Sequence, residues 1–218
     1  MQIQMLKVGI LQTNCYLVWD TCTRDCAVID PGGEAPRILE AIQTQSLEVR
    51  AYLLTHAHFD HFRALWPMYE AYPAPAYVGK EDLDPLVNPA PRRFVPLPDT
   101  RFPLDGDTIP AGILRFSVFS CPGHTPGGLS YLCEDVLFTG DTLFHLDCGR
   151  CDLPCSDPQA LLRSLGRLRD LPGNYRVYPG HFDTTTLHEE RLHNPYLQPG
   201  VVFSDPEPEE ELWDPGKV

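Results

Sequence analysis

The sequence contains no hydrophobic run that could cross a membrane and no excess of positive charge. None of its apolar stretches approaches the roughly 20 residues of a membrane-spanning helix. Its 17 lysines and arginines are outnumbered by 30 aspartates and glutamates, which gives the 218-residue chain a net charge of −13. Because nucleic-acid binding depends on lysine and arginine contacts to phosphate, we expect neither a membrane nor a nucleic acid as a partner.

The first residues, MQIQM, also lack the basic and apolar regions of a secretory signal. We therefore expect a cytoplasmic protein whose 8 cysteines are reduced thiols rather than disulfides. Hydrophobic residues make up 43% of the chain and charged residues 22%, which is an ordinary globular composition. We predict one domain over residues 1–200, followed by an acidic, proline-containing tail over residues 201–218.

Short apolar runs alternate with amphipathic segments along the chain. Apolar runs typical of strands occupy residues 14–19, 26–30, 51–54, 113–120, 129–132, 136–139 and 175–178. Helical spacing of apolar residues occupies residues 34–45, 62–72, 158–170 and 185–193. The proline-rich stretch 72–110 is predicted to be mostly loop and to shape the mouth of a substrate site. This order indicates an α/β fold in which helices cover the outer faces of two sheets.

Four motifs that follow apolar runs carry candidate chemistry: THAHFDHF at 55–62, CPGHTPGG at 121–128, FTGDTLF at 138–144 and YPGHFD at 178–183. The first motif places three histidines and an aspartate within six residues. Imidazole and carboxylate groups are preferred ligands of zinc and of non-haem iron. In an extended segment His56 and His58 point to the same side, so both can reach one ion. Asp60 and His61 follow a bend and could face a neighbouring ion.

Each of the other three motifs adds one candidate ligand: His124, Asp141 and His181. Taken singly, each has an ordinary structural explanation, such as a helix cap for Asp141. Together with the first motif they predict a shared metal site.

In their order and spacing, these four motifs resemble the metallo-β-lactamase fold superfamily. Within it they are most similar to the short bacterial branch of glyoxalase II (hydroxyacylglutathione hydrolase)-like enzymes. The similarity also includes TNCYLV at 13–18, VIDPGG at 28–33, GRCDLP at 149–154 and ERLHNPYL at 190–197, so it reaches about residue 200. The resemblance implies an αβ/βα four-layer sandwich, in which two mixed sheets carry helices on their outer faces.

The resemblance also implies a ligand set for two divalent metal ions. His56, His58 and His124 would hold the first ion, and Asp60, His61 and His181 the second. Asp141 would bridge both. Zinc is the expected metal, with iron or manganese as alternatives.

The implied reaction is hydrolysis of a small thioester or ester by a hydroxide that bridges the two ions. Asp60 would orient or deprotonate this hydroxide and is the candidate catalytic residue. Arg150, in the GRCDLP motif, is the candidate substrate contact. A thiolate leaves without help from an acid, so a thioester suits a site with no evident general acid.

Two other branches of the superfamily share part of this pattern. Class B β-lactamases use a cysteine where this chain has Asp141 and lack a histidine at the place of His61, so β-lactam hydrolysis is not expected. Persulfide dioxygenases share the H-x-H-x-D-H string. A resemblance to them implies a site with one iron, held by the equivalents of His56, His124 and Asp141. The HFD sequence after Gly180, in place of the more usual GHGP, keeps a mononuclear iron sulfur dioxygenase as the alternative function.

One further loop contains Cys148, Cys151 and Cys155. Their spacing could hold an extra metal ion, although structural zinc requires four ligands. Reduced cysteines in a loop are the preferred interpretation.

Overall fold

The structure is a computed structural model that describes residues 1–203. Residues 204–218 lie outside the described part, and they include nearly all of the predicted tail. The proposed domain boundary near residue 200 therefore stays a prediction.

Two mixed sheets form the centre of the described chain. In spatial order the first sheet consists of β1 (Gln2–Val8), β2 (Thr13–Trp19), β3 (Asp25–Ile29), β4 (Glu48–Leu53), β5 (Ala76–Tyr77) and β6 (Thr100–Arg101). It is antiparallel from β1 to β3 and parallel from β3 to β6. The second sheet consists of β14 (Thr185–Thr186), β13 (Arg176–Pro179), β10 (Val136–Gly140), β9 (Leu129–Cys133), β8 (Leu114–Ser120) and β7 (Thr108–Ala111). Its β10–β13 pair is parallel and its other pairs are antiparallel.

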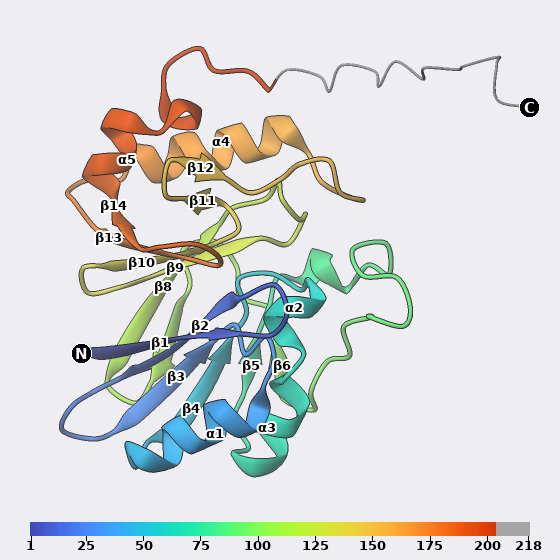
Figure 1. The fold of residues 1–218 in the computed structure, drawn as a ribbon, viewed down its shortest axis with the longest axis vertical. Helices are drawn as coiled ribbons and strands as arrows, with labels where there is room; N and C mark the ends of the chain where they lie inside the picture. Colours follow the sequence, from blue (N-terminus) through green and yellow to red (C-terminus); the bar gives the residue numbers. More distant parts are fainter. Residues whose placement is uncertain (204–218) are drawn as a thin grey trace, which may run out of the picture.

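Helices cover the outer face of each sheet (Figure 1). The first sheet is covered by α1 (Ala35–Thr44) and α3 (Leu65–Ala71), and the second by α4 (Pro158–Arg169) and α5 (Leu187–His193). The alternation of β2 produces this layering, because Tyr16 and Val18 enter the core between the sheets while Cys15 and Leu17 pack toward α1 and α3. The predicted four-layer αβ/βα sandwich is thus confirmed.

Helix α4 illustrates how the local sequence sets an element. Its amide at Ala160 donates to the side chain of Asp157, the N-cap residue, at 2.9 Å. Pro158 occupies the first helical position, where its missing N–H costs nothing. Leu161 and Leu165 lie one turn apart and are fully buried against the outer face of the second sheet. The helix predicted over 158–170 therefore has the expected bounds and the expected buried face.

The segment 62–72, predicted as one helix, differs in the structure. It is divided between α2 (Phe59–Phe62) and α3, with a break at Arg63 and Ala64. Pro67 explains the break, since it lacks an N–H and is tolerated only in the first turn of a helix, where α3 places it. The remaining short elements are η1 (Lys80–Leu83), η2 (Pro195–Leu197) and a ribbon of β11 (Leu143–Phe144) and β12 (Asp147–Cys148).

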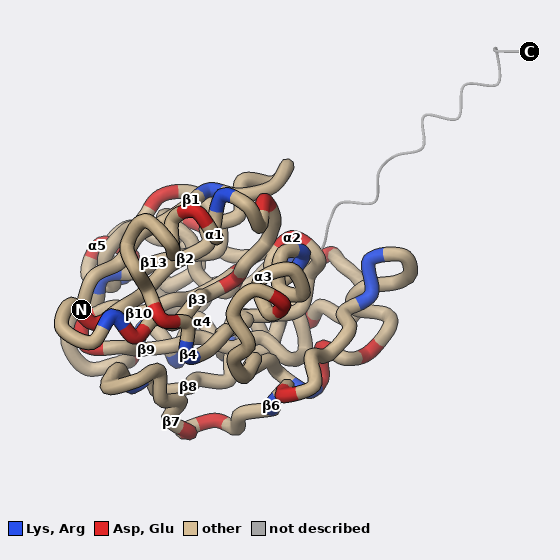
Figure 2. Tube along the Cα trace, turned by 90° about the horizontal axis from the view of Figure 1, so that it is seen from below, with Lys and Arg blue, Asp and Glu red and all other residues tan. Residues whose placement is uncertain are grey.

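Within residues 1–203, no helix is both long and apolar enough to span a membrane. Acidic and basic residues are intermixed along the described trace (Figure 2). The expectation that nucleic acid is no partner stays a prediction.

Candidate metal centre

The seven side chains predicted as metal ligands lie together where the ends of β4, β8, β10 and β13 meet. The loop after β4 supplies four of them, and the loops after β8, β10 and β13 supply one each. These residues are His56, His58, Asp60, His61, His124, Asp141 and His181.

The ligand atoms form two adjacent groups with Asp141 between them. One group consists of His56, His58 and His124, and the other of Asp60, His61 and His181; within each, all ligand atoms lie within 4.8 Å of one another. The Asp141 Oδ1 atom lies 3.5 Å from His61 Nε2, and its Oδ2 atom lies 3.6 Å from His124 Nε2 and 3.5 Å from His181 Nε2.

Three atoms at this centre are buried without a hydrogen-bond partner in the described residues: His56 Nε2, His61 Nε2 and Asp141 Oδ1. An orphaned buried polar atom is costly, and native proteins rarely leave one without a ligand, water or ion. His56, His61 and Asp141 also bring their ligand atoms within 4.8 Å of one another. A divalent cation coordinated by imidazole and carboxylate groups fits this arrangement.

The opposite ring nitrogens of the same histidines are fixed by hydrogen bonds. His56 Nδ1 lies 3.1 Å from Thr55 Oγ1, and His61 Nδ1 lies 3.0 Å from Asp30 Oδ2. His124 Nδ1 lies 2.7 Å from the carbonyl oxygen of Arg150. Such contacts orient each ring so that its Nε2 atom faces the other candidate ligands, and His124 Nε2 lies 2.9 Å from His58 Nδ1.

Local charge makes one side of the centre attractive to a cation. Burial alone would lower the pKa of His61, but the carboxylates of Asp141, Asp30 and Asp60 raise it to about 10. Burial likewise opposes ionisation of Asp60, yet hydrogen bonds from His181 and Thr13 and the charge of His61 hold its pKa below the usual range. By contrast, burial and its neighbours His124 and His61 lower the pKa of His58 to about 4. The carboxylates around His61 therefore favour positive charge, whether a proton or a metal ion carries it.

Asp30 is a functional residue that sequence reasoning missed. It lies in the VIDPGG motif, is 1% exposed, and contacts His61. Its other hydrogen bonds come from the amide of Thr55 at 2.8 Å and the hydroxyl of Thr55 at 2.7 Å. Asp30 thereby fixes both His61 and the start of the THAHFDHF motif. Its position directly after an apolar run, as for the candidate ligands, is the sequence signal that points to it.

Asp82, from η1, was missed as well. It is 1% exposed and accepts hydrogen bonds from the amide of Ala57 at 2.8 Å, the amide of Gly127 at 2.6 Å and the hydroxyl of Thr125 at 3.0 Å. It thus joins the loop that carries His56 and His58 to the loop that carries His124. A single aspartate in a proline-rich stretch gave no sequence signal for this role.

Asn14, in the TNCYLV motif, holds the fourth ligand loop. Its amide donates to the carbonyl oxygen of Gly180 at 2.7 Å. Its side-chain Nδ2 donates to the carbonyl oxygens of Pro179 and Phe182, each at 3.0 Å. These bonds fix His181 from both sides.

A cavity of about 820 Å³ opens over the centre. His58, Asp60, His124, Asp141 and His181 lie at its metal-facing side. Residues 87–92 of the proline-rich stretch line it as well. That this stretch shapes the mouth of a substrate site stays a prediction.

Arg150 lines the same cavity, and its guanidinium forms two hydrogen bonds of 2.8 Å with Asp152. A bound anion would share that guanidinium with Asp152, and its predicted role as a substrate contact stays a prediction. The three loop cysteines are free thiols. Cys148, Cys151 and Cys155 do not form a metal-binding group within residues 1–203, which favours the ordinary interpretation of this loop.

Comparison with known proteins identifies the family. Residues 8–181 match the metallo-beta-lactamase superfamily. The hydroxyacylglutathione hydrolase GloC of Haemophilus influenzae is 33% identical over 209 residues, which cover 90% of this chain and 98% of GloC. The probable polyketide biosynthesis zinc-dependent hydrolase PksB of Bacillus subtilis is 32% identical, covering 84% of this chain and 81% of PksB.

Solved structures agree with the fold. TTHA1623 in a di-iron-bound form superposes with a TM-score of 0.79 at 39% identity, covering 89% of this chain and 100% of that chain. ETHE1 from Myxococcus xanthus superposes with a TM-score of 0.75 at 33% identity, covering 89% of this chain and 84% of that chain.

The B3 metallo-beta-lactamase BLEG-1 gives a TM-score of 0.82 at 32% identity, with 90% of this chain and 99% of that chain covered. The matching residues span most of the chain and include all seven clustered side chains. The chain therefore belongs to the metallo-beta-lactamase superfamily.

Proposed function

We propose that this protein is a dinuclear metallohydrolase that cleaves a small thioester or ester. The observation that carries the proposal is the set of orphaned atoms at His56, His61 and Asp141, which lie where two groups of ligand atoms meet.

His56, His58 and His124 would hold one ion, and Asp60, His61 and His181 the other, with Asp141 in contact with both. When bound, two such ions lower the pKa of a water molecule and stabilise negative charge on the attacked carbonyl oxygen. Zinc is the proposed metal because PksB is named a zinc-dependent hydrolase. The di-iron form of TTHA1623 makes iron the alternative.

Asp60 is placed to contact the attacking water in this reaction. Its Oδ2 atom accepts a hydrogen bond from the Thr13 hydroxyl at 2.8 Å and lies 3.4 Å from His181 Nε2. The lowered pKa keeps the carboxylate ionised, and Thr13 fixes its orientation. Asp60 is therefore better suited to orient a nucleophilic water than to accept its proton, because a lowered pKa makes the carboxylate a weaker base.

The composition of the cavity favours a thioester. Its ionisable lining residues are the proposed metal ligands together with Arg92 and Arg150. No further acidic group is present in that described lining to protonate a leaving group. A thiolate departs readily without such help, whereas an alkoxide or amide does not. The name of GloC, a hydroxyacylglutathione hydrolase, agrees with this substrate class.

The test combines metal analysis with three assays. Metal-free protein would be reconstituted with zinc or, separately, with iron(II). Each form would be assayed on S-lactoylglutathione, on a chromogenic cephalosporin, and for oxygen uptake with glutathione persulfide. We expect zinc-dependent thioester hydrolysis that His56→Ala abolishes. The control His193→Ala replaces an exposed histidine of α5 and should retain full activity. Oxygen uptake by an iron-loaded protein, or β-lactam hydrolysis without thioester hydrolysis, would overturn the proposal.

A further inference from the structure

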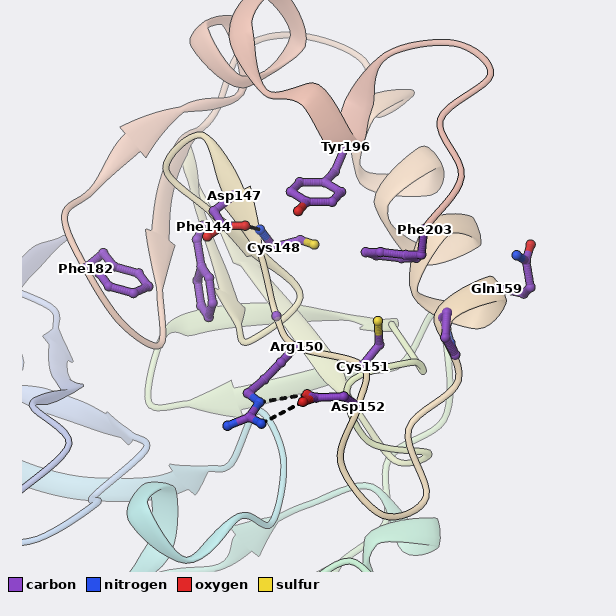
Figure 3. A pocket seen from close by; sticks show the side chains of 12 residues that line it. Phe144, Asp147, Cys148, Arg150, Cys151, Asp152, Gln159, Phe182, Tyr196 and Phe203 are labelled. Carbon is purple, nitrogen blue, oxygen red and sulfur yellow. Dashed lines mark hydrogen bonds and ion pairs between the residues drawn. The ribbon is translucent and has the colours of Figure 1, made fainter. Parts of the chain in front are cut away.

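A second cavity of about 780 Å³ adjoins the cavity over the metal centre. The two cavities share Phe144, Arg150 and Phe182 as lining residues. Figure 3 shows the rings of Phe144, Tyr196 and Phe203 around this second cavity, with Phe182 beyond Phe144. The second cavity is therefore adjacent to the cavity over the metal centre, with these three side chains at their boundary.

Two of the three charged side chains of the second cavity form an ion pair, and the third, Asp147, is acidic. Arg150 and Asp152 neutralise each other through two hydrogen bonds of 2.8 Å, along the lower edge of the cavity in Figure 3. Asp147 accepts a hydrogen bond from the amide of Cys148 at 2.8 Å. The rest of the lining is mostly aromatic side chains, proline and cysteine. This environment suits an uncharged apolar group better than a carboxylate.

Phe182 stands at the boundary between the two cavities in an unusual conformation. Its φ of 65° lies in the left-handed region, which favours glycine, and its side chain is 60% exposed. The hydrogen bond from Asn14 to its carbonyl oxygen holds the strained backbone. The ring packs edge-on against Phe144 with the centroids 5.3 Å apart. An exposed ring on a strained backbone contributes little to the free energy of folding. A contact with a ligand therefore explains better why phenylalanine occupies this position.

We infer that the second cavity is a subsite for an uncharged, apolar arm of the substrate, and that Phe144 and Phe182 contact this arm. The inference rests on the proposed function, because it places the reacting carbonyl at the metal centre and one arm of the thioester beyond Phe144. Burial of the arm against aromatic rings removes apolar surface from water and so strengthens binding.

The first experiment varies the substrate arms. One series lengthens the acyl group from acetyl to octanoyl on N-acetylcysteamine, and the other lengthens an alkyl thiol on an acetyl group. We expect kcat/KM to rise by about tenfold or more along one series, which also identifies the arm. The suberoyl thioester matches the octanoyl chain length but ends in a carboxylate, and a corresponding carboxyalkyl thiol serves the second series. For these charged analogues kcat/KM should not show the rise seen with the uncharged chains of the same length.

The second experiment changes Phe182. Glycine adopts a φ of 65° without steric cost, so Phe182→Gly is expected to fold. It should raise KM for the longest apolar substrate and reduce the gain along the series by about tenfold. The control Leu146→Gly also places glycine at a left-handed residue, with φ 58°, outside both cavity linings, and should behave as wild type.

Calorimetric binding of alkyl N-acetylcysteamine thioethers, which have no carbonyl to attack, supplies a readout independent of catalysis. Affinity should rise with alkyl length, and Phe182→Gly should weaken it. Equal hydrolysis of short and long substrates by wild type and Phe182→Gly, with no length-dependent binding, would overturn the subsite and leave the proposed function intact. Length-dependent thioether binding by a protein inert to every thioester would keep the subsite and refute the proposed function.

Discussion

Replacing Gly180 by alanine directs one methyl group at the proposed metal centre. A Cβ atom at this residue would lie 2.1 Å from Asp141 Oδ1 and 2.8 Å from His61 Cε1. Gly180 is outside the left-handed region, so alanine brings no backbone strain. Its amide donates to the carbonyl oxygen of Gly140 at 2.8 Å, and its own carbonyl accepts from Asn14 at 2.7 Å. With the backbone held in this way, the Asp141 carboxylate has to move.

The size of that movement sets the expected effect. Ordinary contact between heavy atoms is about 3.5 Å, so the Asp141 oxygen must retreat by about 1 Å or more. Misplacement of a reacting group by that distance costs about 100-fold in rate, and disturbed ligand geometry weakens metal binding by about 10- to 100-fold. Overpacking lowers the free energy of unfolding by about 1–3 kcal/mol. Gly180→Ala should therefore fold, bind metal weakly and lose most of its activity.

The assay measures kcat/KM on a thioester, metal content after dialysis against a weak chelator, and thermal unfolding of the metal-free protein. Gly166→Ala is the control, because it lies inside α4 and, apart from its neighbours in the chain and the backbone of its own helix, no heavy atom lies within 4 Å of its Cβ position. This control should raise the free energy of unfolding by about 0.5–1 kcal/mol and leave activity unchanged. If Gly180→Ala kept full metal content and a rate within about threefold of wild type, Asp141 would not occupy the central position assigned to it.

Three further predictions address the residues around the centre. Asp30→Asn keeps the shape of the side chain but removes the charge opposite His61, so a chelator titration should show metal affinity lower by about 10- to 100-fold, and unchanged affinity would contradict this role. Asp82→Ala leaves three buried donors without an acceptor and should lower the free energy of unfolding in urea by about 3 kcal/mol or more, whereas a loss below about 1 kcal/mol would refute the account of Asp82. Arg176→Ala removes an exposed ion pair with Asp135 and a long contact of 3.5 Å with the Tyr178 hydroxyl, so the same urea measurement should change by less than about 1 kcal/mol, and a larger loss would show that these contacts are worth more than their exposure implies.

The four motifs were sufficient to predict that the seven candidate ligands lie together, since each follows an apolar run that is a strand in the structure. Histidine and aspartate at such strand ends converge because the ends of neighbouring strands meet at one edge. The same pattern predicted the layering, and the structure differs mainly at short elements. β5 and β6 have two residues each, too few for any periodicity to be visible.

The supporting residues were harder to predict because their roles depend on tertiary contacts. Asp82 accepts a hydrogen bond from the hydroxyl of Thr125, which is 43 residues away in the sequence. Nothing in the local sequence distinguishes Asp82 from an ordinary loop aspartate. Asn14 acts on the backbone of Phe182, at a separation of 168 residues. β1 was not predicted either, because its glutamines and lysine mask the apolar alternation of an edge strand. Burial that comes from distant parts of the chain leaves no periodic trace in the sequence.

Anomalous diffraction from crystals of the reconstituted protein tests the central claim most directly. Data collected at the zinc and iron edges would locate each ion and identify it. We predict two zinc peaks about 3.5–4 Å apart, with Asp141 between them. One peak should lie among His56, His58 and His124 and the other among Asp60, His61 and His181. A single iron peak held by His56, His124 and Asp141 would contradict the account and favour the dioxygenase alternative.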